Sequence, residues 1–249
     1  MSGHSKWSQI KRKKGKNDQE RGKLFSKLLR EISAAAKGGA DPEGNPRLRT
    51  VLQAARAANM PADNIDRAIR KGTGELPGVV YEEVVYEGYG PSGVAVLVLC
   101  LTENRNRTGG DMRHVFDRFG GHLGGAGSVA WKFDVRGVLT VDRAGVDEET
   151  LLGVALDAGA LDVDTSDDEV YEVLTPMAAL ETVRRALVDH RVAVASAEIS
   201  RLPQNTIALS PAEALKVLKL TDALEDHDDV QKVWSDLDIP EEVLAKLGG

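Results

Sequence analysis

Residues 138–199 read VLTVDRAGVDEETLLGVALDAGALDVDTSDDEVYEVLTPMAALETVRRALVDHRVAVASAEI, and this stretch decides the fold. Alternating apolar residues predict strands, and apolar residues three and four apart predict helices. The predicted elements are a strand at Val138–Val141, a helix at Asp147–Ala158, strands at Leu161–Thr165 and Val170–Leu174, a helix at Pro176–His190 and a strand at Val192–Ile199. This βαββαβ order is the split βαβ pattern of ferredoxin-like domains.

The segments on either side of this stretch predict a second α/β domain. Before it come strands at Val79–Glu87 and Val94–Leu101, a helix at Thr108–Phe119, the glycine-rich passage Gly120–Gly127 and a strand at Val129–Phe133. After it come a helix at Pro211–Glu225 and a strand at Val230–Leu237. We therefore predict an α+β protein in which residues 76–134 and 202–249 form one α/β domain. Residues 135–201 form an acidic ferredoxin-like domain inserted into it.

Residues 1–75 predict a helical module preceded by a basic arm. The first 16 residues contain six Lys and Arg, no acid and no hydrophobic period, which is typical of an arm that does not compact. Helices are predicted at Gln19–Lys37, with Asn17 or Asp18 as N-cap, and at Pro46–Ala58 and Pro61–Lys71. Asn45 is the expected N-cap of the second helix, and Gly72 is the expected C-cap of the third.

The charge of the chain is divided between these parts. The whole chain has a net charge of −7, which by itself argues against nucleic acid as a partner. Residues 1–75, however, hold 17 Lys and Arg against 8 Asp and Glu, a balance of +9. Residues 76–249 hold 15 against 31, a balance of −16. Such asymmetry indicates a specialised basic module.

The basic module carries the candidate binding residues. In the first helix Lys23, Lys27, Arg30 and Lys37 lie opposite the apolar face, so one face packs and the other is a row of cations. Phosphate neutralisation is the simplest reason to gather such charge, although a solvated tail would also account for it. A second basic patch is predicted at the turn Asn104–Thr108, with Thr108 as a cap, and exposed loop residues are its alternative. The predicted nucleic-acid-binding residues are Lys6, Trp7 (by stacking), Lys11, Arg12, Lys13, Lys14, Lys16, Arg21, Lys23, Lys27, Arg30, Arg49, Arg105 and Arg107.

The sequence lacks the residue patterns of disulfide, metal, dinucleotide and catalytic sites. Cys100 is the single cysteine, and five scattered histidines show no zinc spacing, so neither a disulfide nor a metal is expected. Gly125–Ala130 fits G-x-G-x-x-A, but it follows a helix and precedes a strand, the reverse of the order that a dinucleotide requires. With no nucleophile elbow, we expect no catalytic residue, cofactor or small-molecule substrate. Because no long apolar stretch or secretory signal is present, we expect a cytoplasmic protein without membrane contact.

Several longer motifs resemble a known family. They are Met1–Ser8 followed by Ile10–Lys14, then Asp41–Arg49, Asn59–Ile65, Tyr86–Pro91, Asn104–Thr108 and Gly127–Trp131. Together they resemble the YebC/PmpR family of probable transcriptional regulators over about residues 1–134. Glu103 stands where the family usually has Asp, which keeps the charge.

The resemblance implies three domains, an N-terminal helical domain and two α/β domains with one inserted in the other. It implies DNA binding and transcriptional regulation without an agreed enzyme activity. Related mitochondrial proteins resemble translational activators, and bacterial relatives are tied to stalled ribosomes. We therefore expect a DNA-binding regulator of transcription, and the alternative is a translation factor that docks on ribosomal RNA. No recognition-helix pattern explains sequence specificity.

Overall fold

The computed structural model describes residues 18–240 and 242–244, with side chains from residue 21 onward. The predicted basic arm and Asn17 lie outside the described residues. Lys132–Asn205 form one compact unit, and the described residues before and after that segment form another. The second unit is therefore discontinuous in sequence. The division into three domains at the predicted boundaries stays a prediction.

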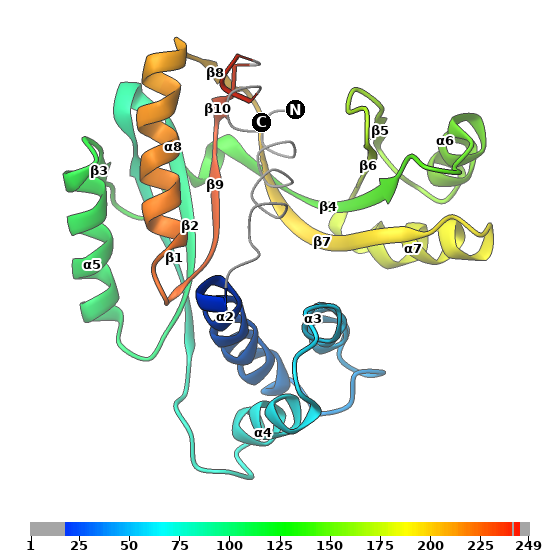
Figure 1. Cartoon of the computed structure of the whole chain (residues 1–249), viewed down its shortest axis with the longest axis horizontal. Coiled ribbons are helices and arrows are strands. Elements are labelled where there is room, and N and C mark those ends of the chain that lie inside the picture. The colour runs from blue at the N-terminus through cyan, green and yellow to red at the C-terminus, as the bar shows by residue number, and fades with distance from the viewer. Residues whose placement is uncertain (1–17, 241, 245–249) are drawn as a thin grey trace. The chain divides into compact units, whose positions relative to one another are not determined.

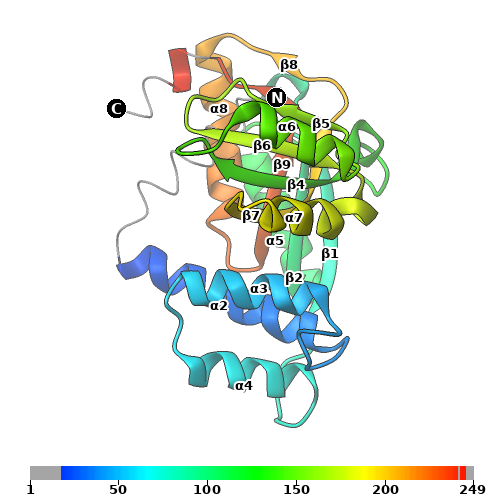
Figure 2. The same cartoon turned by 90° about the vertical axis from the view of Figure 1, so that its right-hand side faces the viewer.

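The unit at Lys132–Asn205 is ferredoxin-like, as predicted. Its elements are β4 (Phe133–Asp142), α6 (Glu148–Asp157), β5 (Asp162–Asp164), β6 (Val170–Thr175), the 3-10 turn η3 (Met177–Ala179), α7 (Leu180–Asp189) and β7 (Val194–Pro203). All strand pairs are antiparallel, and the order is β5-β6-β4-β7. The helices pack against each other, and Leu151, Leu187 and Leu139 meet in one buried core. Figure 2 shows this unit with α6 and α7 covering the sheet.

One long strand, β4, replaces two strands that the sequence predicted. Val129 precedes the strand, and η2 (Ala130–Lys132) is a 3-10 turn. Gly137, which falls between the two predicted strands, lies inside β4 and pairs with both Thr175 and Ile199. A Cβ at Gly137 would lie within 3 Å of both Thr175 and Leu180, so this glycine permits close packing of the strand. A glycine inside a strand pattern can mark such close approach as well as a strand end.

The helical module consists of α2 (Asp18–Ala36), α3 (Pro46–Ala57) and α4 (Ala62–Gly72), and both α3 and α4 pack on α2. Asn45 caps α3 by accepting the Leu48 N–H, and its amide donates to the Ala35 and Gly39 carbonyls. One buried side chain therefore joins the end of α2 to the start of α3. Gly72 is not the C-cap of α4, because the cap is Thr73.

The second unit also contains a four-stranded antiparallel sheet in the order β3-β1-β2-β9. Its elements are β1 (Glu82–Tyr89), η1 (Pro91–Gly93), β2 (Ala95–Thr102), α5 (Arg105–Arg118), β3 (His122–Leu123), α8 (Pro211–Glu225) and β9 (Val230–Ser235). A short parallel pair is formed by β8 (Ile207–Ala208) and β10 (Leu237–Asp238). Helices α5 and α8 pack on this sheet and against each other (Figure 1). Strand β2 comes before the 132–205 segment in sequence, and its partner β9 comes after it. The sheet is therefore complete only when the chain has passed through the 132–205 unit.

The glycine-rich passage wraps a buried carboxylate. Glu87 of β1 accepts the backbone N–H groups of Gly127, Val129 and Ala130 at 2.6 to 2.8 Å. Gly127 has a φ of 82°, which favours glycine. The passage therefore uses its N–H groups inside the protein and does not offer these three to a ligand.

Candidate nucleic-acid interface

The cationic row of α2 contacts acidic residues at the end of α8. Lys23, Lys27 and Arg30 are spaced four and three residues apart, so they share one side of the helix. Lys23 Nζ lies 3.0 Å from Asp226 Oδ1, and Lys27 Nζ donates to the Glu225 carbonyl. The row is therefore half-buried against the end of α8, and α2 has contacts on two sides.

Burial changes the pKa of Lys27, the middle cation of this row. Burial of the Lys27 ammonium lowers its pKa, and the carboxylates of Glu225, Asp226 and Asp228 offset only part of that effect. Removing an ammonium group from water is costly unless oxygen atoms replace the water. The acidic segment supplies those oxygens, so the charge of Lys27 is compensated within the chain.

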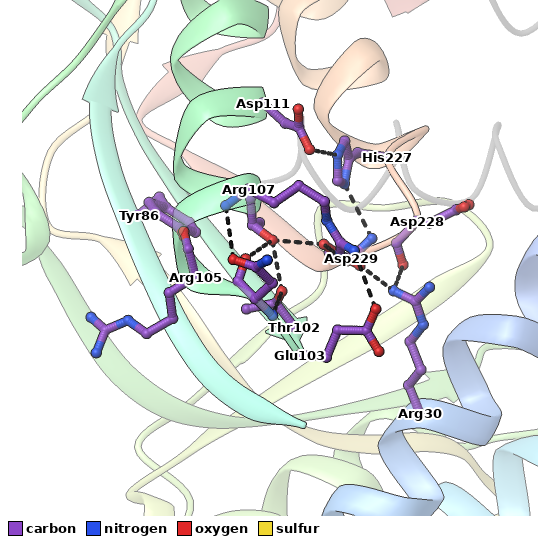
Figure 3. A network of polar contacts seen from close by, with 12 residues as sticks. Arg30, Tyr86, Thr102, Glu103, Arg105, Arg107, Asp111, His227, Asp228 and Asp229 are labelled. Carbon is purple, nitrogen blue, oxygen red and sulfur yellow. Dashed lines mark hydrogen bonds and ion pairs between the residues drawn. The ribbon is translucent and has the colours of Figure 1, made fainter. Parts of the chain in front are cut away.

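Asp229 is the centre of the contact between α2 and the sheet domain. Its side chain is only 3% exposed. Arg30 donates to Oδ1, whereas Arg107 Nη2 and Thr108 Oγ1 donate to Oδ2 at 2.8 and 2.7 Å (Figure 3). Burial alone would raise the pKa of Asp229, but hydrogen bonds from Thr108, Arg107 and Arg30 outweigh it and hold the pKa below its usual value. The carboxylate is thus a fixed negative charge shared by two arginines from distant segments.

The turn Asn104–Thr108 is the first turn of α5. Asn104 is the N-cap and accepts the Arg107 N–H at 3.1 Å. The prediction of Thr108 as cap is wrong, because the helix begins three residues earlier and Thr108 is buried inside it. Thr108 Oγ1 also lies 2.7 Å from Thr102 Oγ1, which joins α5 to the end of β2. This first turn of α5 therefore holds the two donors, Arg107 and Thr108, in position to bind the Asp229 carboxylate.

His227 extends the same network toward α5. Its Nδ1 accepts the backbone N–H of Asp229 at 3.1 Å, which leaves the proton of a neutral ring on Nε2. Nε2 lies 3.3 Å from Asp111 Oδ2. The segment that follows α8 is thus held on α2 and α5 at several points.

A cavity of about 450 Å³ lies beside this network. Its lining consists of three basic residues, five acids and one aromatic residue: Arg30, Arg107, His227, Glu103, Asp111, Asp226, Asp228, Asp229 and Tyr81. A phosphate inside it would face more carboxylates than guanidinium groups. The described residues contain no group of three side chains suited to a metal ion. The cavity therefore has the electrostatics of an ion-pair network around the buried Asp229 and not those of a phosphate pocket.

The other candidate residues lie apart from this network. Arg49 Nε and Nη2 donate to the carbonyls of Pro42 and Glu43, so this guanidinium holds the loop before α3. The Arg21 guanidinium lies 5.2 Å from the centre of the Phe25 ring. Arg105 is exposed, and Figure 3 shows its side chain pointing away from Asp229. The candidates Lys6, Trp7, Lys11, Arg12, Lys13, Lys14 and Lys16 lie outside the described residues.

Sequence reasoning missed the role of the acidic segment Glu225–Asp229. The signal was present, because three acids and a histidine, Asp226–Asp229, stand between the predicted helix that ends at Glu225 and the next predicted strand. Nothing in their spacing indicates that a helix about 200 residues away supplies the counter-charges. Exposed Arg113 and Arg118 of α5 were also missed, since only the start of that helix was considered.

Two family models and several known proteins match nearly the whole chain. Residues 5–75 match the family model described as the TACO1/YebC protein N-terminal domain, and residues 81–237 match the one described as the TACO1/YebC second and third domain. A probable transcriptional regulatory protein of Geobacter sulfurreducens is 54% identical over 99% of this chain and 100% of its own length. One of Persephonella marina, with the same description, is 51% identical over 99% and 100%.

A solved structure agrees with these matches. The crystal structure of a conserved hypothetical protein from Aquifex aeolicus is 48% identical, with a TM-score of 0.83, over 91% of this chain and 94% of that chain. Within the described part of the chain, no helix combines the length and apolar character needed to cross a bilayer.

Proposed function

The chain belongs to the TACO1/YebC family, and from that premise we propose that it is a DNA-binding regulator of transcription acting through its basic N-terminal module. The proposal agrees with the names of the relatives, which are called probable transcriptional regulatory proteins. The proposed role is one of binding, with no chemical step.

The observation that carries the proposal is the separation of charge along the chain. The balance of +9 in residues 1–75 stands against −16 in the remainder. Lys and Arg that neutralise DNA phosphates release counterions, which drives binding without base contacts. Within the described helical module, Arg56, Arg67 and Lys71 are exposed and have no carboxylate partner among the described residues. These side chains are therefore free to meet phosphates.

The cations of α2 can bind DNA only by leaving the partners that they have within the chain. Lys23 and Arg30 already bind carboxylates, and Lys27 binds a carbonyl oxygen. DNA phosphates would have to compete with Glu225–Asp229 for them. We therefore assign the primary contact to the arm residues Lys6–Lys16, with Trp7 stacking on a base or sugar, and not to the row on α2.

The test measures duplex DNA affinity against salt concentration. The Lys13→Ala/Lys14→Ala variant of the full chain should lower the slope of log affinity against log salt by up to about 2, since each phosphate contact contributes about 0.9. Lys216→Ala/Lys219→Ala, on an exposed side of α8, removes the same charge and should leave the slope almost unchanged. An unchanged slope in the arm variant would remove the arm from the site.

The ribosome is the alternative target, and the same variants separate the two. Co-sedimentation with ribosomes that disappears in Lys13→Ala/Lys14→Ala, together with no site recovered by genomic footprinting, would overturn the transcriptional proposal. Recovery of defined promoter sites with the wild-type chain, lost in the variant, would support it.

A further inference from the structure

Helix α5 concentrates the positive charge of an otherwise acidic domain. Residues 76–131 and 206–249 contain 8 Lys and Arg against 16 Asp and Glu. Four of those eight cations, Arg105, Arg107, Arg113 and Arg118, stand within the 14 residues of α5. A random scatter would place about one there. The domain is thus acidic in total and basic along one helix.

The arginines of α5 divide by what they contact. Arg107 binds Asp229 and Glu103, so its charge is compensated. Arg105 and Arg113 are exposed and have no carboxylate partner among the described residues. Arg118 is exposed and lies over the ring of Phe119 at 5.6 Å. Three of the four guanidinium groups are therefore available to a partner.

The exposed face of α5 includes a glycine, so part of this surface has no side chain above the helix backbone. Thr108, Met112 and Phe116 form its buried side. The opposite side carries Asn106, Gly110, Arg113 and His114, all exposed. A Cβ added at Gly110 would meet nothing within 4 Å, so the helix backbone is directly accessible there. Such a surface lets an extended backbone approach the helix closely.

The acids of α5 do little to neutralise this face. Asp111 is turned toward His227. Asp117 is exposed and contributes one negative charge. At a rise of about 1.5 Å per residue, Arg105 and Arg113 are separated by about 12 Å along the axis, and Arg118 lies about 7.5 Å further on. At about 100° per residue, Arg113 and Arg118 border the exposed face on its two sides, and Arg105 projects from the first turn on the side of Met112. The charges are thus spread along and around the helix, which suits an extended polyanion better than a single small anion.

We propose that the exposed face of α5 is a second contact surface for the sugar–phosphate backbone of nucleic acid, separate from the N-terminal module. The inference rests on the proposed nucleic-acid binding and adds a site to it. An arginine guanidinium can donate two parallel hydrogen bonds to two oxygens of one phosphate. The side-chain amide of Asn106 and the ring of His114 add further donors. Protein interfaces are usually anchored by exposed aromatic or aliphatic side chains, and none of the exposed large hydrophobic residues of the described chain lies on α5. The face therefore fits nucleic acid better than an acidic protein.

The experiment uses the full chain and a duplex DNA of arbitrary sequence. Arg113→Gln/Arg118→Gln should weaken binding and lower the salt slope by up to about 2. Asp117→Asn should strengthen binding, because it removes the exposed acid from the same face. Arg113→Lys/Arg118→Lys, which keeps the charge, should retain most of the slope. Circular dichroism and the thermal midpoint should be unchanged in all three.

The control pair is Lys216→Gln/Lys219→Gln on α8, which removes equal charge from the neighbouring helix. An equal loss in this pair would assign the effect to bulk charge and overturn the proposal. Unchanged DNA binding in Arg113→Gln/Arg118→Gln, with binding still weakened by Lys13→Ala/Lys14→Ala, would overturn this inference and leave the proposed function standing. No DNA binding by the wild-type chain would overturn the proposed function itself. Loss of binding to polyglutamate alone, with DNA binding intact, would assign the face to an acidic protein.

Discussion

Arg30 and Asp229 are 199 positions apart in sequence and form an ion pair in which the carboxylate is almost fully buried. The pair joins α2 of the helical module to the segment between α8 and β9. Because Arg107 and Thr108 bind the other oxygen of the same carboxylate, three segments of the chain meet at one charge. Removing that charge tests how far the network stabilises the fold.

Asp229→Ala should lower the free energy of unfolding by about 2 to 3 kcal/mol, because it leaves two arginines without their shared counter-charge. Urea denaturation measures the change. Asp228→Asn is the control, since Asp228 is exposed and its backbone carbonyl still accepts from Arg30. The control should stay within about 0.5 kcal/mol of the wild type. Equal stability of Asp229→Ala and the control would show that the network contributes nothing net.

Asp229 should also make stability depend on pH. Its pKa is lower in the folded than in the unfolded chain, so the unfolded chain binds more protons in the acid range. The stabilisation is complete above the ordinary carboxyl value of about 3.9 and is lost as the pH falls through the lower folded value. Urea midpoints measured below about pH 4 should therefore fall less steeply in Asp229→Asn than in the wild type. Parallel curves would contradict this assignment.

The acidic segment should compete with DNA for the cations of α2. Asp226→Asn/Asp228→Asn weakens the hold on Lys23 and removes local repulsion, so duplex DNA affinity should rise by up to about fivefold, the effect of one exposed ion pair. Asp157→Asn/Asp189→Asn removes the same charge from exposed positions in the 132–205 unit. If both doubles raise affinity equally, total charge explains the result and α2 is not a competing site.

Gly72 should tolerate no side chain, because α4 crosses α2 closely at this point. A Cβ there would lie 2.3 Å from the Ser33 carbonyl oxygen. Gly72→Ala should therefore cost about 1 to 3 kcal/mol of unfolding free energy. Gly153→Ala in α6 is the matched control, since a Cβ at Gly153 meets nothing within 4 Å, and it should be neutral or stabilising by up to about 1 kcal/mol. Thermal unfolding of both variants decides the point.

Cys100 should be chemically inert in the folded chain. The residue is fully buried in β2, and burial, together with the nearby charge of Asp229, raises the pKa of its thiol to about 12. Since the thiolate is the reactive form, a thiol reagent should modify the native chain far more slowly than the denatured chain. Rapid labelling of the native chain at neutral pH would contradict the buried placement.

Local patterns predicted most elements closely, because each pattern is produced by the element itself. The α8 helix spans Pro211–Glu225 as predicted, with Ser210 and Glu213 forming a capping box, and Asn45 caps α3 through a contact three residues away. The predictions were less accurate where a glycine was involved. Gly137 falls between two predicted strands and Gly72 is predicted as a C-cap, but Gly137 lies inside β4 and Gly72 is the last residue of α4. At each of them a neighbouring segment packs closely.

The sequence predicted which segments carry the positive charge of the candidate site, but not which of these cations the fold pairs with carboxylates. The sequence by itself determined the ferredoxin-like order, the helical module and the concentration of cations in residues 1–75, because composition and periodicity are properties of contiguous residues. Only the tertiary structure decided which cations remain available. Lys23, Lys27 and Arg30 bind an acidic segment about 200 residues away, whereas Arg105, Arg113 and Arg118 stay exposed. The physical reason is that the pairing of a charge depends on distances in space, and no local pattern encodes which distant carboxylate a folded chain brings within reach.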